Sequence, residues 1–146
     1  KNLLVLGTSD KSEYSIGYFT KFGDGCADLL PISKLYKTQL REFAKMLGVP
    51  NNIITKKSSP NLWKGHIAEE ELGITFEEID SILYCLEKRL SVDEIVKKTE
   101  IKKDFVEKIC QMHENSWHKR LPPKRIVQNM DEINKLISRM ENDANI

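Results

Sequence analysis

The sequence of 146 residues lacks the features that assign a chain to a membrane, nucleic-acid-binding or disulfide-rich class. Its longest aliphatic run is Leu3–Leu6, whereas a membrane span needs roughly 20 apolar residues. The 23 Lys and Arg residues balance 22 Asp and Glu residues to a formal charge of +1, so no global attraction to nucleic acid or acidic membranes is expected. The three cysteines, Cys26, Cys85 and Cys110, are too widely spaced for a disulfide framework or a CxxC zinc site. With no signal peptide visible after Lys1, we expect a cytoplasmic protein without nucleic-acid or membrane partners.

The first residues lack an initiator methionine and open directly on an apolar run. Leu3–Leu6 is followed by Gly7, Thr8 and Ser9, which is typical of a buried parallel strand that enters a turn and a helix. A strand buried on both faces needs neighbours, and the chain offers only residues 53–55 as a second candidate. We therefore expect Lys1 to lie within a domain whose other strands precede it. A small α+β domain with a minimal sheet is the alternative.

The remainder of the sequence predicts helices, and a hydrophobic fraction of 40% is enough for a packed core. Ser9 is the expected cap of a helix over residues 10–19. A stronger helix follows Pro31 and ends near Gly48, with an apolar face formed by Tyr36, Leu40, Phe43, Ala44 and Leu47.

Two capping boxes, Thr75 with Glu78 and Ser91 with Glu94, each predict the start of a further helix. Another helix carries Phe105, Val106, Ile109 and Met112, and an amphipathic helix is expected over residues 127–146. The segment 55–74 is expected to be a loop, either a lid over a site or plain surface. His66 and His113 are expected to be polar surface residues, and Trp63 and Trp117 to be packing residues.

Two groups of residues are candidates for a ligand site. Thr8 and Glu13 follow the proposed strand, where open α/β sheets bind ligands; a threonine there can bind a nucleotide and a carboxylate can hold Mg²⁺. An ordinary helix start with a solvent-facing glutamate explains the same pattern. Lys21 and Lys37 flank Asp24 and Asp28, which favours either a phosphate site with carboxylates nearby or an ordinary charged surface.

The helix pair 92–117 and the basic run 118–125 together resemble a helix-turn-helix DNA reader. The acidic residues Asp104, Glu107 and Glu114 on the second helix argue against this class, because phosphates would repel them. The cluster His118-Lys119-Arg120 can equally bind the phosphates of a small molecule or stabilise a helix C-terminus.

Taken in order, these segments resemble the C-terminal half of the ammonia-dependent NAD synthetases. The resemblance covers roughly residues 2–126 and rests on residues 7–50, KKSSPNLW (56–63), ELGITFEEID (71–80) and HENSWHKRLPP (113–123). It implies an α/β fold: the C-terminal part of a Rossmann-like, parallel-sheet ATP-pyrophosphatase domain over residues 1–126, mostly helical in this chain. The amphipathic helix of residues 127–146 follows that domain. The family usually works as a homodimer. It adenylates the carboxylate of deamido-NAD with Mg-ATP, and ammonia then displaces AMP to give NAD.

Carried onto the residues that match its motifs, the resemblance implies specific roles. Thr8, Lys37 and Ser59 would contact ATP, and Glu13 would bind Mg²⁺. Contacts to deamido-NAD would come from Lys21, Asp28, His118 and Lys119, in a site shared between subunits. Asp24 would be a buried carboxylate that takes a proton near the incoming ammonia, and the segment 55–74 would be the lid over the adenylate.

One family motif is missing from the sequence. The SGGxDS-type phosphate loop of the ATP-pyrophosphatases has no counterpart in the 146 residues, so the phosphate-loop half of the domain is not represented. We therefore expect an incomplete part of the enzyme that does not catalyse the reaction by itself. The alternative is a non-catalytic nucleotide-binding or oligomerisation fragment.

Overall fold

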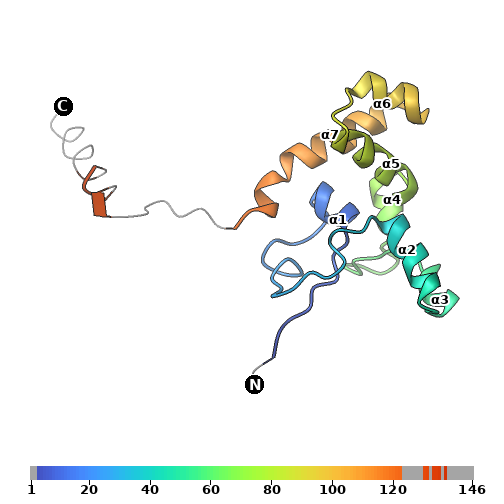
Figure 1. Cartoon of the computed structure of the whole chain (residues 1–146), viewed down its shortest axis with the longest axis horizontal. Helices are drawn as coiled ribbons and strands as arrows, with labels where there is room; N and C mark the ends of the chain where they lie inside the picture. The colour runs from blue at the N-terminus through green and yellow to red at the C-terminus, as the bar shows by residue number, and fades with distance from the viewer. Residues whose placement is uncertain (1–2, 123–129, 132, 136, 138–146) are drawn as a thin grey trace.

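The computed structural model describes residues 3–122, 130–131, 133–135 and 137, and their regular structure is helical. In chain order the helices are α1 (Lys11–Ile16), α2 (Lys37–Met46), α3 (Asn51–Ile54), α4 (Ala68–Leu72), α5 (Phe76–Glu87), α6 (Val92–Thr99) and α7 (Lys103–Asn115), with a 3₁₀ turn η1 (Trp117–Arg120) after them. Helix α5 is central, because it packs against α1, α2, α6 and α7. Figure 1 shows α6 above α5 and α2 and α3 below it, with α7 running from beside α6 toward the middle of the view.

The core lies where α5, α6 and α7 meet. Ile79 and Ile82 of α5, Ile95 of α6 and Ile109 of α7 have no exposed surface. Burying each such side chain stabilises the fold by about 1.5–3 kcal/mol relative to leaving it in water. The predicted capping boxes are confirmed at Thr75 and at the start of α6, where both the side-chain and the reciprocal bonds are present.

The apolar run at the start of the described chain is not a buried strand. Leu3 is 76% exposed and Leu6 is 62% exposed, and a single parallel bridge joins Leu6 to Leu29. The amide of Gly7 donates to the carbonyl of Leu29 at 2.8 Å, so one edge of the run is paired. Burial on both faces needs further strands, and the residues described supply none.

Several local predictions are wrong. Residues 53–55 are not a strand, because Asn51–Ile54 forms the short helix α3. The cap of α1 is Asp10 and not Ser9, and α1 ends at Ile16 because Gly17 adopts the left-handed conformation at φ +72°. The segment 55–74 is not loop throughout, since it contains α4.

Helix α2 has the predicted apolar face, but only one end of that face is buried. Tyr36, just before its first turn, is 5% exposed, whereas Phe43 and Leu47 are 45% and 66% exposed. The first turn packs against α1 and α5. Helix α2 also contacts the short helix α3, but Phe43 and Leu47 stay exposed.

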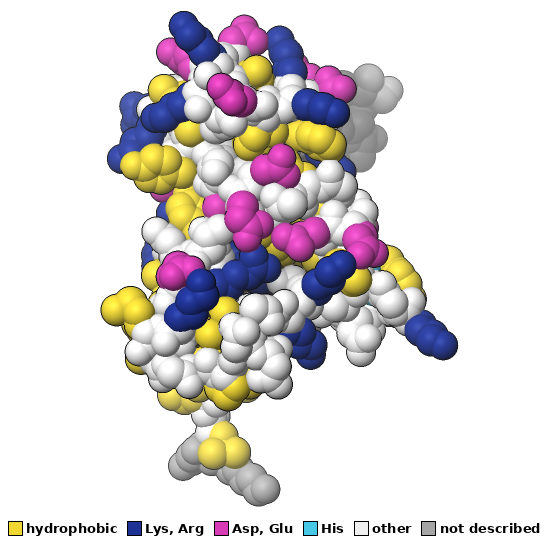
Figure 2. Space-filling view, turned by 90° about the vertical axis from the view of Figure 1, so that its right-hand side faces the viewer, with side chains coloured by type: hydrophobic (Ala, Val, Ile, Leu, Met, Phe, Trp, Pro, Cys, Tyr) yellow, Lys and Arg dark blue, Asp and Glu magenta, His cyan; other side chains and the backbone are white. Residues whose placement is uncertain are grey.

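The amphipathic helix expected over residues 127–146 lies almost wholly outside the described residues, so the division at residue 126 stays a prediction. On the face shown in Figure 2, acidic and basic side chains are interspersed, as the balanced composition leads one to expect. Among the described helices, none combines the length and the apolar character that a membrane crossing requires.

Candidate functional site

A cavity of about 390 Å³ lies beside the N-terminus of α1. Five of the residues assigned roles by the resemblance line it: Thr8, Glu13, Asp24, Lys37 and Ser59. They come from the turn before α1, from α1, from the loop after it, from α2 and from the loop before α4. The lysines Lys56 and Lys57 add positive charge to the same wall. The fold thus gathers residues that lie up to about fifty positions apart into one polar, cation-rich hollow.

The ammonium group of Lys37 lies between two carboxylates at the edge of this cavity. Its Nζ is 2.7 Å from Glu13 Oε1 and 2.6 Å from Asp10 Oδ2. The Asp10 side chain is only 1% exposed, Lys37 14% and Glu13 21%. Burial alone would lower the pKa of Lys37, but the charges of Glu13 and then Asp10 raise it. Burial, and next the charge of Asp10, raise the pKa of Glu13, although Lys37 opposes both.

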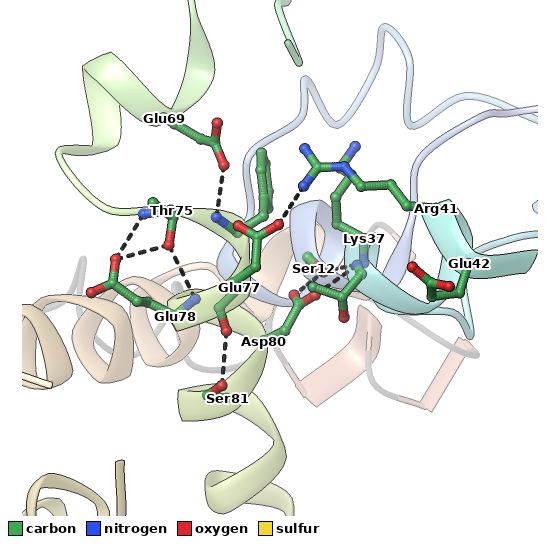
Figure 3. A network of polar contacts seen from close by, with 12 residues as sticks. Ser12, Lys37, Arg41, Glu42, Glu69, Thr75, Glu77, Glu78, Asp80 and Ser81 are labelled. Atoms are coloured by element: carbon green, nitrogen blue, oxygen red, sulfur yellow. Dashed lines mark hydrogen bonds and ion pairs between the residues drawn. The ribbon is translucent and has the colours of Figure 1, made fainter. Parts of the chain in front are cut away.

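A buried aspartate on α5 holds the two helices that carry this ion cluster. Asp80 is 6% exposed and points from α5 toward Ser12 and the start of α2 (Figure 3). Its carboxylate accepts a hydrogen bond from the Ser12 hydroxyl and another from the amide of Thr38 at 2.9 Å. The Ser12 oxygen in turn accepts from the amide of Lys37 at 2.8 Å. Asp80 therefore fixes the first turn of α2, and with it Lys37, relative to α1.

The negative charge of Asp80 lies at the N-terminus of α2, where it is favourable. Helix α2 has no side-chain cap of its own at Tyr36, so the carboxylate satisfies one of the amides that a helix N-terminus leaves free. Burial raises the pKa of Asp80, while the hydrogen bonds from Ser12 and Thr38 lower it and offset part of that effect.

A second cavity of about 400 Å³ adjoins the first and shares Tyr18, Asp24 and Pro60 with it. Lys119 lines this second cavity, but its Nζ also donates to the carbonyls of Gly17 and Phe19, both at 2.7 Å. Lys119, which was predicted to contact a ligand, thus also has a structural role, because it holds the end of α1 against η1.

The other residues predicted to contact deamido-NAD lie apart from the two cavities. Lys21 and Lys119 line a third hollow near η1, and Lys21 Nζ donates to the carbonyl of His118 at 2.6 Å. Asp28 accepts a hydrogen bond from the amide of Val5 at 2.8 Å and so holds the apolar run of the first residues. The structure brings the predicted ATP and metal residues together, and Lys119 lines the adjoining cavity, but Lys21, Asp28 and His118 line neither cavity.

Asp24 is not the buried carboxylate that was expected. It is exposed, and its Oδ1 accepts from the amide of Thr20 at 2.7 Å. Asp24 lines both cavities, but the predicted burial is wrong.

Sequence reasoning missed four residues around the cavities: Asp10, Tyr18, His66 and Glu71. His66 was expected at the surface, but it is 4% exposed and is bonded to Tyr18 and Glu71. Nothing in the local sequence around position 66 signals this burial, because the partners come from other segments.

The first cavity fits a Mg²⁺ ion that enters together with the phosphates of a substrate. Among the described residues, no group of three or more His, Cys, Asp or Glu side chains could hold a metal ion by itself. Mg²⁺ is commonly bound by only one or two carboxylates together with substrate phosphates, and Glu13 is a carboxylate that faces a cavity lined by lysines.

Comparison with known proteins assigns the chain to a family. The family model described as NAD synthase matches residues 1–123, so the chain belongs to the NAD synthase family. The chain is 57% identical over 122 residues to an NH(3)-dependent NAD(+) synthetase of Saccharolobus solfataricus, which covers 83% of this chain and 44% of that protein. For the corresponding Aeropyrum pernix protein, the identity is 51% over 121 residues, covering 82% of this chain and 42% of that protein.

Two solved structures are also similar to this chain. An NMN synthetase from Francisella tularensis matches with a TM-score of 0.68 and 38% identity, covering 86% of this chain and 48% of that one. An NH3-dependent NAD synthetase from Campylobacter jejuni matches with a TM-score of 0.63 and 28% identity, covering 87% and 47%. The chain therefore spans about half the length of the relatives it matches.

Proposed function

We propose that this chain takes part in the ATP-dependent amidation of deamido-NAD to NAD, with ammonia as the nitrogen donor. The observation that carries the proposal is the single cavity in which Thr8, Glu13 and Lys37 meet Ser59. Membership of the NAD synthase family supports it. The Rossmann-like sheet of the ATP-pyrophosphatase type, a homodimer and a cytoplasmic location belong to the same proposal.

The chemistry explains why such a cavity suits the reaction. A carboxylate is a poor acyl donor, because its leaving group would be oxide; adenylation replaces that leaving group with AMP. Mg²⁺, when bound with ATP, would neutralise charge on the phosphates. Lys37, Lys56 and Lys57 add fixed positive charge, which stabilises charge on the α-phosphate and on the departing pyrophosphate.

Glu13 would hold Mg²⁺, which would supply charge neutralisation at the phosphates. Lys37, whose Nζ lies 2.7 Å from Glu13 Oε1, would add its positive charge beside that carboxylate. Asp24 would lie near the incoming ammonia, where a carboxylate can accept a proton from ammonium. Ser59 would reach ATP from the loop that precedes α4.

The test is calorimetric titration of Mg-ATP and deamido-NAD into the chain. We expect both to bind, and Glu13→Gln to weaken Mg-ATP binding at least tenfold while the helical circular dichroism is unchanged. Glu42→Gln, which removes an exposed carboxylate of α2, is the matched control and should bind normally. Equal Mg-ATP affinity in Glu13→Gln and wild type would remove Glu13 from the metal role, and no Mg-ATP binding to the wild type would refute the proposal.

Turnover is a separate measurement. Because the sequence has no SGGxDS-type motif, we expect the chain alone to release no pyrophosphate from ATP in the presence of deamido-NAD. We propose that Lys119 contacts deamido-NAD, so Lys119→Ala should weaken that ligand and not Mg-ATP. Mg-ATP binding without any deamido-NAD binding would favour a non-catalytic nucleotide-binding module, and tight, salt-sensitive binding of duplex DNA would favour a DNA reader.

The likeness to the Francisella tularensis NMN synthetase supports a second candidate substrate. NMN is the amide of nicotinate mononucleotide, so the same amidation of a nicotinate carboxylate would act on a smaller molecule. Parallel titrations with nicotinate mononucleotide and deamido-NAD decide between them. If nicotinate mononucleotide binds at least tenfold more tightly than deamido-NAD, the mononucleotide becomes the proposed substrate.

A further inference from the structure

Three titratable side chains meet in the wall between the two cavities. The Tyr18 hydroxyl donates a hydrogen bond to Glu71 Oε2, and His66 Nε2 lies 2.7 Å from the same oxygen. The Tyr18 hydroxyl is also 3.2 Å from His66 Nε2. Tyr18 comes from the segment after α1, Glu71 from α4 and His66 from the loop before α4. This cluster of Tyr18, His66 and Glu71 thus joins two parts of the chain about fifty residues apart.

The imidazole ring of His66 is held in one orientation. The Trp63 ring stacks on it with a centroid distance of 3.4 Å and an interplanar angle of 12°. The other ring nitrogen, Nδ1, is buried and has no hydrogen-bond partner among the described atoms. A buried nitrogen without a partner is unfavourable, so the ring is kept in place by its Nε2 contacts and by Trp63.

The backbone of His66 controls the loop that lines the first cavity. The Ser59 hydroxyl donates to the His66 carbonyl, and the Ser59 oxygen accepts from the amide of Asn61 at 3.1 Å. The amide of Ala68 donates to the carbonyl of Ser58 at 2.9 Å and closes the base of the loop. The position of Ser59 in the first cavity therefore depends on where His66 lies.

Tyr18 completes the connection, because it lines both cavities. His66 and Glu71 line the second cavity, and Ser58 and Ser59 line the first. A ligand in the second cavity would contact Tyr18, Glu71 and His66, and any restriction of His66 is passed to Ser59 through its carbonyl.

We propose that His66 is a positioning residue that couples the two cavities, so that a ligand in one raises the affinity for a ligand in the other. The identity of the ligands, Mg-ATP in the first cavity and the nicotinate substrate in the second, rests on the proposed function. Restricting the loop 58–66 costs conformational entropy. If the first ligand restricts the loop on binding, the second ligand binds to a loop that is already ordered and loses less entropy. Coupling of this kind is reciprocal and usually amounts to about 5- to 150-fold in affinity.

The binding experiment measures Mg-ATP affinity with and without saturating deamido-NAD. We expect about tenfold tighter Mg-ATP binding in the presence of deamido-NAD for the wild type. Tyr18→Phe and His66→Ala should abolish that enhancement. His66→Gln should retain part of it, since its amide can still donate to Glu71. Lys64→Ala, an exposed change on the same loop, is the matched control and should keep the full enhancement.

A measurement without ligands separates this inference from the proposed function. Hydrogen exchange at the amides of Asn61 and Ala68 reports whether the loop is closed, because both amides donate within it. Tyr18 lies outside the loop 58–66, and Tyr18→Phe removes only its hydroxyl. We expect this change to lower the protection of both amides. Unchanged protection, or ligands that bind without mutual enhancement in the wild type, would overturn the coupling while leaving the function intact. Lowered protection in a chain that binds neither ligand would support the link from Tyr18 through His66 to the loop and would refute the proposed function.

Discussion

Replacement of Lys37 by methionine tests the ion cluster directly. Methionine keeps most of the aliphatic stem but removes the charge that lies between Asp10 and Glu13. Removing one partner of a buried ion pair usually costs 3–5 kcal/mol, because the other charge stays buried and unpaired. Asp10 is 1% exposed in its side chain, but Glu13 keeps 21%, so we expect the lower end, about 3 kcal/mol at pH 8.

The pH dependence gives the sign of the effect. The pKa of Glu13 is already raised in the folded chain, by burial and then by Asp10, and loss of Lys37 raises it further. A carboxyl group with a raised folded-state pKa lowers stability when it is ionised, and this penalty disappears as the pH falls toward the unfolded value of 4.5. The difference in stability between Lys37→Met and wild type should therefore be largest at pH 8 and shrink toward pH 5.

Urea unfolding followed by circular dichroism at both pH values provides the measurement. Glu13→Gln and the double variant complete a mutant cycle, in which loss of Lys37 should cost at least about 1 kcal/mol less once Glu13 is already neutral. A loss below about 0.5 kcal/mol at pH 8, or a loss that grows on acidification, would show that the two carboxylates do not share the ammonium in solution.

Three further substitutions test other parts of the fold, each by urea unfolding. Asp80→Ala leaves the Thr38 amide and the Ser12 hydroxyl without an acceptor and should cost about 2–4 kcal/mol; a loss under about 1 kcal/mol would contradict the geometry. Ser91→Ala removes the side-chain cap of α6 and should cost about 1 kcal/mol, and an unchanged urea midpoint would disprove the cap. Ile109→Ala should lower the free energy of unfolding by about 2–5 kcal/mol, because the side chain is fully buried. A loss near zero would contradict that burial.

The sequence predicted those elements whose signals are local. Helices α5 and α6 begin at capping boxes, and a box is complete within four residues, so it can be read without knowing the rest of the fold. Leu3–Leu6 has the composition of a buried strand, but burial depends on neighbouring strands that the described residues do not contain. The same dependence explains why the last turn of α2 is exposed despite its amphipathic pattern.

The candidate site was predicted in part. The resemblance placed Thr8, Glu13, Lys37 and Ser59 in one site, and the structure brings them to one cavity. Asp80 carried a signal that could have been read: it lies on the apolar face of α5, four residues after Phe76 and three before Leu83. The burial of His66 carried no such signal, because it depends on Tyr18, which lies 48 positions away, as well as on Trp63 and Glu71 nearby.

The contact between α1 and η1 has a consequence for how the chain folds. Lys119 donates to the carbonyl of Phe19 across 100 positions, and Arg120 donates to the carbonyl of Ser15 across 105. The pairs α5–α6 and α6–α7 need only short segments to meet, whereas this closure must bring remote ends of the described chain together against loop entropy. The wall around Gly17 and Tyr18 should therefore consolidate last during refolding, after the helical core is already compact.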